Sequence, residues 1–435
     1  MKQKFVKSRP AIFFLKLIKF IHQIVVHRFY GYDFKQLSIE STEALEHRFK
    51  FYFALTNGFD QNIDKIIEME QKINFGTWLI RFGYLVSMLR AIAIINIHDE
   101  TAIYFGDSAY GSNDRDYLWI VIIVGVTVMV MCHEIVLIVE KKGGFVGEPS
   151  RIKVLLKNGF SHFPFVKPRQ KDFCRFFYLL SAFHNIALTM LVPYIVILYN
   201  YELCICIYNY FSLKTIICEI VWTLTLTPLV IYLAVQELCY GSLFYIYVGV
   251  FYFHMNSLKN ATSWLLESID KPQNTDIKFI AKNALLLFNK MDSYSSKVRS
   301  LVLYFYTGVA FQSLWFIHFS IIVGNHSVVM DILIALLGIF IILYNLIISL
   351  FSAQLNNKVR SLYSMWHKIY CKSKSNAIMK LKMIEILNRI TLSSTGVQIG
   401  DFGLITNQFV LVFFLEFVST IMMFKVNFGS FFAKQ

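Results

Sequence analysis

The sequence has few charged residues for its length, and acidic residues are the scarcer kind. Charged side chains make up 16% of the 435 residues, with 28 Asp and Glu against 42 Lys and Arg, whereas hydrophobic residues make up 56%. A soluble domain could not cover so much apolar surface, so the composition indicates a polytopic membrane protein. The net charge of +14 does not indicate nucleic-acid binding, because cytoplasmic loops that face anionic lipid account for it.

Motifs for catalysis and for metal binding are also lacking. The sequence contains no glycine-rich phosphate loop, no paired cysteines at zinc spacing and no His-Glu-x-x-His. His133 and Glu134 are adjacent and so point in different directions on a helix, which favours a structural or conformational role. We therefore expect no enzyme activity, no cofactor and no metal site.

Seven apolar windows of roughly 20 residues are long enough to cross a membrane as helices. They cover residues 77 to 97, 117 to 139, 176 to 199, 214 to 236, 301 to 323, 330 to 353 and 404 to 427. Basic residues gather in alternate connections, with 12 in 1 to 76, nine in 140 to 175, seven in 257 to 299 and eight in 354 to 402. The positive-inside rule then places the N-terminus in the cytoplasm and the C-terminus outside. A G-protein-coupled receptor has the opposite orientation.

Cysteine is scarce in the predicted outer loops. Only Cys204 and Cys206 of the seven cysteines fall in one, and the outer loop 98 to 116 contains none. A disulfide that joins two outer loops therefore cannot form. This too counts against the G-protein-coupled receptor class.

The apolar run from Ala11 to Tyr32 is interrupted by basic side chains, among them Lys16, Lys19 and Arg28. This pattern favours a basic amphipathic helix on the inner membrane surface over a cleavable signal sequence. An eighth span is the alternative, but it would place the N-terminus outside, against its own charge.

The sequence predicts an all-α membrane protein whose helices continue into the cytoplasm as an anchor bundle. Apolar and aromatic residues follow the fourth span to about Leu258, which is more than a bilayer needs. Segments 279 to 300, 354 to 372 and 378 to 392 have the spacing of amphipathic helices. These helices are expected to pack beneath the membrane.

Three glycines precede the final span: Gly396, Gly400 and Gly403. They allow a sharp break, so the last element is expected to consist of two helices. The chain would then divide into a cytoplasmic N-terminal region, the first four spans with the inward extension, a cytoplasmic helix, the fifth and sixth spans with their extension, and an anchor helix with the last span. The corresponding boundaries are 1–76, 77–258, 259–300, 301–372 and 373–435.

Polar side chains inside the spans are candidate ligand-binding residues, because groups that are costly to bury in hydrocarbon usually face the protein interior or water. The candidates are His184, Asn185, Thr189, Trp222, Thr225, Gln312, Trp315 and His318. Together they could line a pocket for a small organic molecule that opens to the outside. In the alternative interpretation each polar group satisfies a neighbouring helix. Arg90 and Glu219, both within spans, are candidates for each other's partner.

The outer half of the last span contains Thr420, Lys425 and Asn427 among bulky apolar residues. Lone polar groups along an apolar helix suit a wall that faces water, as in a channel assembled from several copies. The alternative is a helix that faces lipid, with Lys425 reaching to the outer surface.

These features together resemble the insect chemoreceptor superfamily, specifically the gustatory receptors. That family ends with a span that bears Thr-Tyr, five mostly apolar residues and Gln-Phe. Here Thr420 and Ile421 are followed by five residues and then by Asn427 and Phe428. The inverted seven-span topology, the long fourth span and the Gly-Asp-Phe-Gly segment before the last span also fit.

The resemblance implies a ligand-gated, non-selective cation channel in the plasma membrane of a sensory dendrite. Such receptors look like homotetramers or heterotetramers that bind a small organic tastant and line a central pore with their last spans. Carried over, Asn427 and Phe424 would form the constriction, and Phe428 and Thr420 would flank it. Four inward ammonium groups would repel cations, so Lys425 is expected to point away from the pore.

Two other functions are open. An odorant receptor subunit that requires a co-receptor would have the same architecture. A transporter or membrane scaffold is the alternative from a different class, although transporters usually show pseudo-symmetric halves and helices broken at mid-membrane. Neither feature is visible in the sequence.

Overall fold

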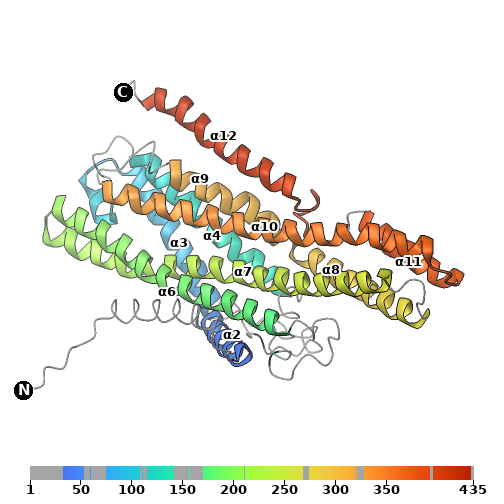
Figure 1. Ribbon diagram of the computed structural model, residues 1–435. Helices are drawn as coiled ribbons and strands as arrows, with labels where there is room; N and C mark the ends of the chain where they lie inside the picture. Colours follow the sequence, from blue (N-terminus) through green and yellow to red (C-terminus); the bar gives the residue numbers. More distant parts are fainter. Residues whose placement is uncertain are drawn as a thin grey trace, which may run out of the picture.

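A computed structural model shows the architecture of the chain (Figure 1). It describes residues 33–52, 59, 75–107, 110, 115–141, 156, 170–209, 211–267, 274–318, 320, 328–391 and 395–432. Regular structure in these ranges is helical, apart from one isolated antiparallel β-bridge. Among the described residues, six helical stretches are long and apolar enough to cross a membrane, and another apolar helix follows at the C-terminal end. The all-α membrane fold expected from the sequence is confirmed.

The first four predicted spans form separate helices. These are α3 (Phe75–Asn96), α4 (Arg115–Lys141), α6 (Gln170–Asn209) and α7 (Leu213–Glu267). Helix α7 is a single helix of 55 residues, so the inward extension predicted for the fourth span is present and continues past Leu258. Every residue of α7 from 238 to 251 is buried, because neighbouring helices surround its inner half.

The fifth predicted span differs from a regular helix. Helix α8 (Asn274–Tyr304) continues through a π-helical turn, η4 (Phe305–Val309), into α9 (Ala310–His318). The apolar run over 301 to 323 predicts one regular span and gives no sign of this turn. A π-turn admits an extra residue into the helix and is frequent at functional sites. Its position follows from packing against neighbouring helices, which local apolar spacing does not encode.

The remaining elements lie as expected along the chain. Helix α10 (Val328–Lys372) combines the sixth span with its inner extension, and α11 (Ala377–Thr391) is the predicted amphipathic helix. The last span is α12 (Asn407–Phe432). The prediction of two helices in the last element is therefore confirmed, whereas the five regional boundaries stay a prediction.

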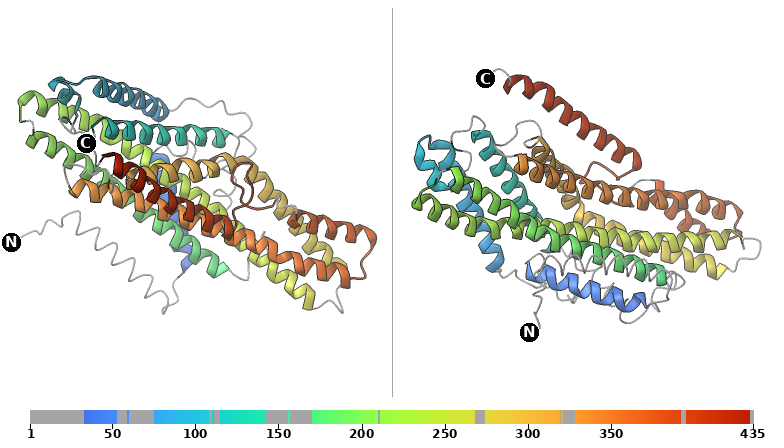
Figure 2. Two further views of the ribbon diagram at one scale, coloured as in Figure 1. Left: turned by 90° about the horizontal axis from the view of Figure 1, so that it is seen from above. Right: turned by 60° about the vertical axis from the view of Figure 1, so that its left-hand side comes forward.

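Long helices run side by side along the molecule in Figures 1 and 2, with α7 in contact with α6, α8 and α10. Helix α11 packs against α8 and α10 at the end predicted to face the cytoplasm. Helix α12 diverges from this bundle, as Figure 1 and the right panel of Figure 2 show. Much of its surface is thus left without cover from the rest of the chain.

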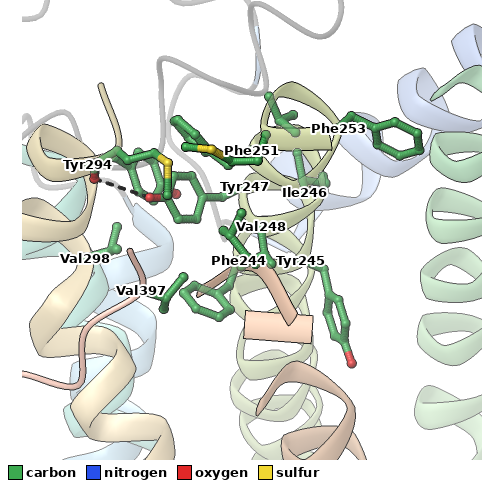
Figure 3. Packing of buried hydrophobic residues seen from close by; sticks show 14 of the residues in the cluster. Phe244, Tyr245, Ile246, Tyr247, Val248, Phe251, Phe253, Tyr294, Val298 and Val397 are labelled. Carbon is green, nitrogen blue, oxygen red and sulfur yellow. Dashed lines mark hydrogen bonds between the residues drawn. The ribbon is translucent and has the colours of Figure 1, made fainter. Parts of the chain in front are cut away.

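Aromatic packing holds the inner half of the bundle together (Figure 3). The ring of Tyr247 on α7 stacks on the ring of Tyr294 on α8, with centroids 3.5 Å apart, and also contacts Phe251 at 4.7 Å. Val397, from the segment between α11 and α12, belongs to the same buried cluster. Large rings in contact bury much apolar area, so this cluster fixes α7, α8 and the last connection relative to one another.

The glycine-rich connection between α11 and α12 turns sharply against α10. Gly400 and Gly403 have φ values of 51° and 129°, which residues with a Cβ rarely adopt. Asn356 on α10 fixes the segment: its Nδ2 donates to the carbonyl oxygen of Ile405 at 2.7 Å, and its Oδ1 accepts from the backbone of Val397 at 3.0 Å. The glycines allow the break, and Asn356 determines its shape.

Helix α2 (Phe34–Phe51) was not predicted as an element of its own. It packs against α6, and Asp33, the residue that caps its N-terminus, accepts a hydrogen bond from the backbone of Lys35. The amphipathic helix expected from Ala11 to Tyr32 lies outside the described residues.

Candidate functional site

Helix α2 occupies the polar part of α6 that was expected to face a ligand. Arg48 donates from Nη1 to the carbonyl oxygen of Asn185 at 3.0 Å and to Oγ1 of Thr189 at 2.8 Å. Asn185 in turn donates from Nδ2 to the carbonyl oxygen of Ser41 at 3.1 Å. Asn185 and Thr189 therefore have partners on another helix of the same chain, as the alternative interpretation of the span polar groups describes.

His184 lies at the junction of α6, α7 and α10. Its Nδ1 is 2.8 Å from the carbonyl oxygen of Leu180 and its Nε2 is 3.2 Å from the hydroxyl of Tyr344. Because a carbonyl oxygen can only accept, Nδ1 carries the proton, and in the neutral ring Nε2 accepts from the hydroxyl of Tyr344. The ring of Tyr245 on α7 lies 5.4 Å from the imidazole. The buried histidine thus links three helices through its side chain.

The arginine within the first span holds the outer loop. Arg90 donates from Nε to the carbonyl oxygen of Phe105 at 2.5 Å and from Nη2 to that of Gly106 at 2.8 Å. Its guanidinium carbon lies 4.8 Å from the ring centroid of Trp222 on α7, and Trp222 is three residues from Glu219 along that helix. Arg90 therefore reaches the turn of α7 that carries its expected partner, and its charge is also balanced by loop carbonyls and a cation–π contact.

A short 3-10 helix, η2 (Glu100–Phe105), shapes this outer loop. Asp99 caps it by accepting from the backbone of Thr101 at 3.0 Å, and hydrogen bonds from Thr101 lower the pKa of Asp99 below its usual value. Gly106 ends it with a φ of 78°. Trp222 donates from Nε1 to the carbonyl oxygen of Tyr104 at 3.0 Å, so this candidate ligand residue anchors the loop.

A buried ion pair closes the same loop and was missed by the sequence analysis. Asp107 is fully buried and forms a salt bridge with Arg115 at the start of α4. Trp119 donates to its other oxygen at 2.9 Å, and Arg115 Nη2 donates to the carbonyl oxygens of Ile94 and Ile97, both at 2.6 Å. Arg115 is the only Lys or Arg in the predicted outer loop 98 to 116. A lone basic residue in an outer loop is the sequence feature that could have indicated this pair.

His133 and Glu134 do face different directions, as expected. His133 is buried, whereas Glu134 accepts from Nε and Nη2 of Arg81 at 2.8 and 2.9 Å on a half-exposed surface. Arg81 and Glu134 link α3 to α4. The fork geometry of this pair suits a structural role.

The candidates on α9 and α7 have different environments. Gln312 and His318 are buried, while the ring of Trp315 lies between them along the helix and 6.1 Å from the imidazole of His318. Thr225 on α7 is exposed, and its hydroxyl donates to backbone carbonyls of its own helix at 3.0 Å. The structure therefore does not bring the eight candidates into one cluster. Gln312, Trp315 and His318 share one helix, whereas the others are distributed among the α2 contact, the three-helix junction, the outer loop and an exposed face.

Helix α12 carries the predicted gate residues. Thr420 is half-buried and donates to the carbonyl oxygen of Glu416 at 2.7 Å. The helix continues to Phe432, but the side chains of Phe424, Lys425, Asn427 and Phe428 lie outside the described part. Large apolar side chains of α12 are exposed at Leu411, Val412, Leu415, Val418, Met422 and Met423.

This arrangement of helices is similar to that of solved structures. Insect olfactory receptor OR5 from Machilis hrabei superposes with a TM-score of 0.60 at 12% identity, over 87% of this chain and 96% of the receptor. The chain has the fold of an insect olfactory receptor. The same receptor in complex with eugenol superposes with a TM-score of 0.55 at 10% identity, over 89% and 98% of the two chains. No protein-family model matches the chain, and no curated protein sequence does.

This fold likeness agrees with the resemblance to insect chemoreceptors drawn from the sequence. It extends over 87–89% of this chain. Both solved neighbours are receptors, not enzymes. A shared fold at this identity does not distinguish a gustatory from an odorant receptor.

Proposed function

We propose that the chain is a subunit of a ligand-gated, non-selective cation channel of the chemoreceptor type. The observation that carries this proposal is the arrangement of α12, an apolar helix of 26 residues with large exposed side chains. It packs on α9 and α10 but diverges from the bundle (Figure 1). A membrane helix that its own chain covers so little suits a pore wall shared among several copies.

In this channel the last helices of a homotetramer, or of a heterotetramer with other receptor subunits, surround the pore. Phe424 and Asn427 form the constriction, with Thr420 and Phe428 beside them, and Lys425 points away from the cations. The assembly lies in the plasma membrane, in a sensory dendrite by resemblance to the family.

The ligand is a small organic molecule that enters from the outer side. Its site is proposed among Gln312, Trp315 and His318, because Asn185 and Thr189 are engaged by α2. A gustatory subtype is favoured by the spacing of the motif in the last span. An odorant receptor subunit is the second candidate, since the solved neighbour is an olfactory receptor and one of its structures is a complex with eugenol.

Whole-cell current from cells that express this chain alone tests the proposal. Sugars, bitter compounds and volatiles including eugenol would be applied, and a ligand-evoked cation current is expected. Asn427→Ala and Phe424→Ala are expected to change its amplitude or ion selectivity because both substitutions widen the constriction.

Asn96→Ala is the matched control for the pore substitutions. Asn96 is exposed at the outer end of α3 and donates to the carbonyl oxygen of Ile92 in its own helix at 2.8 Å, so its replacement should leave the current unchanged. Silence with tetramers at the surface would point to a required partner subunit. Silence with only monomers would contradict the channel function.

A further inference from the structure

Gln312 is a buried amide without a partner. Its side chain is 1% exposed, and neither Oε1 nor Nε2 has a hydrogen-bond partner among the described residues. Gln236 on α7 is equally buried, but its Nε2 donates to the carbonyl oxygen of Tyr52 at 3.0 Å. A buried amide whose carbonyl and amino groups are both unpaired lowers the stability of the folded protein. Residues that lower stability in this way are typical of positions retained for function.

Helix α9 contacts α4, α10 and α12, and Gln312 lies on the continuous helix that runs from α8 through the π-turn into α9. Directly before the π-turn, Tyr304 donates from its hydroxyl to the carbonyl oxygen of Val128 at 2.8 Å or to Glu237 at 3.0 Å. A Cβ on Gly308 would lie 2.7 Å from the ring of Tyr304, so Gly308 is on the same side as that ring. Gln312 is four residues after Gly308, and residues four apart lie on one face of a helix. Gln312 therefore lies on the helix face that carries Gly308, further along the chain than the ring of Tyr304.

The helix surface around this amide is apolar. Val309, Trp315 and Phe316 are three or four residues from Gln312 and so are its neighbours on the helix. An amide in such a setting offers an acceptor and a pair of donors that a guest molecule could satisfy. A neutral amide cannot balance an ionic ligand, whereas a hydroxyl or an amide group both donates and accepts.

We propose that the Gln312 carboxamide is the polar anchor of the ligand site, and that it selects neutral molecules with a hydroxyl or amide group over the corresponding ethers. This anchor rests on the proposed function, because the ligand it binds is the one that opens the channel. Binding of the ligand can nevertheless be measured without recording a current. The ligand's apolar remainder contacts the aromatic surface of α9.

The first test is the thermal unfolding of the purified, ligand-free protein in detergent. Gln312→Met keeps the length of the side chain and removes the unpaired amide, so the midpoint is expected to rise by about 1–4 °C. Gln236→Met is the matched control and should lower the midpoint, because the carbonyl oxygen of Tyr52 loses its donor. A fall in Gln312→Met as large as that in Gln236→Met would show that the Gln312 amide is paired, and would overturn the proposal.

The second test compares binding of matched alcohols and methyl ethers to the same protein, with eugenol and its methyl ether as one pair. The wild-type protein is expected to prefer at least one alcohol or phenol by about tenfold or more, because the ether cannot donate to Oε1. In Gln312→Met the ratio of the alcohol affinity to the ether affinity should approach one. Equal binding of alcohols and ethers, or no binding across the panel, would overturn the proposal.

The two proposals fail separately. Currents evoked equally by alcohols and ethers would retain the channel function and reject Gln312 as the anchor. Selective binding that Gln312→Met abolishes, in a protein that forms no channel, would retain the anchor and reject the channel.

Discussion

The ring of Tyr306 in the π-turn packs edge-on against the ring of Phe413 on α12, with centroids 5.1 Å apart. It contacts Phe409 in the same way at 5.2 Å. The hydroxyl of Tyr306 donates to Oγ of Ser349 on α10 at 2.6 Å. The side chain of Tyr306 thus connects the π-turn to α10 and to the proposed pore helix α12. The conformation of the π-turn determines where this side chain points.

Tyr306 is expected to couple ligand binding to α12. Tyr306→Phe retains the ring contacts but removes the bond to Ser349, at a cost of about 1 kcal/mol, so the half-maximal ligand concentration should shift by about fivefold. Tyr306→Ala should shift it further because the contacts with Phe409 and Phe413 are also lost. Dose–response curves measure both shifts. Identical curves for the wild type and Tyr306→Ala would contradict the coupling role.

Gly241 permits close contact between α7 and α10. A Cβ at this position would lie 2.4 Å from the hydroxyl oxygen of Tyr344, so Gly241→Ala should destabilise the protein by about 1–3 kcal/mol through overpacking. Gly125→Ala in α4 is the control, because a Cβ there meets nothing within 4 Å. Thermal unfolding should show a lower midpoint for Gly241→Ala and a midpoint at or above the wild type for Gly125→Ala. Equal midpoints would show that Tyr344 moves aside without cost.

The buried pair of Asp107 and Arg115 should be essential to the outer loop. Arg115→Met leaves the buried carboxylate without its ion-pair partner and should cost about 3–5 kcal/mol. Asp116→Asn is the control: Asp116 is exposed and 3.8 Å from Arg115, and such surface pairs contribute about 0–1 kcal/mol. Surface labelling and thermal unfolding would compare the two variants. Normal folding of Arg115→Met would show that Asp107 is stabilised in another way.

Arg48 should hold α2 on α6. Arg48→Met removes donors to Asn185 and Thr189, and charged hydrogen bonds of this kind contribute about 1.5–3 kcal/mol each. Hydrogen exchange over residues 34–51 is expected to accelerate. The control Gln36→Met, which removes an exposed hydrogen bond to Glu40 within α2 at 2.9 Å, should leave exchange nearly unchanged. Unaltered protection in Arg48→Met would mean that apolar packing alone holds the helix.

The local pattern of the sequence predicts the spans well because each depends on its own residues. Apolar length locates α3, α4, α6 and α10, and the continuous apolar run of the fourth span predicts the extension of α7. The glycines before the last span predict the break between α11 and α12. Helix α2 and the π-turn were missed, since both depend on contacts with other helices.

The sequence by itself therefore determined an all-α membrane protein and the order of its spans, because the hydrophobic effect and the hydrogen-bonding needs of the backbone act locally along each helix. Only the tertiary structure decided the partners of the polar groups. It directed Asn185 to α2 and Arg90 to the outer loop, and it left the amide of Gln312 unpaired. Residues far apart in the chain meet only after helices pack, and that packing depends on the shapes of all their side chains together.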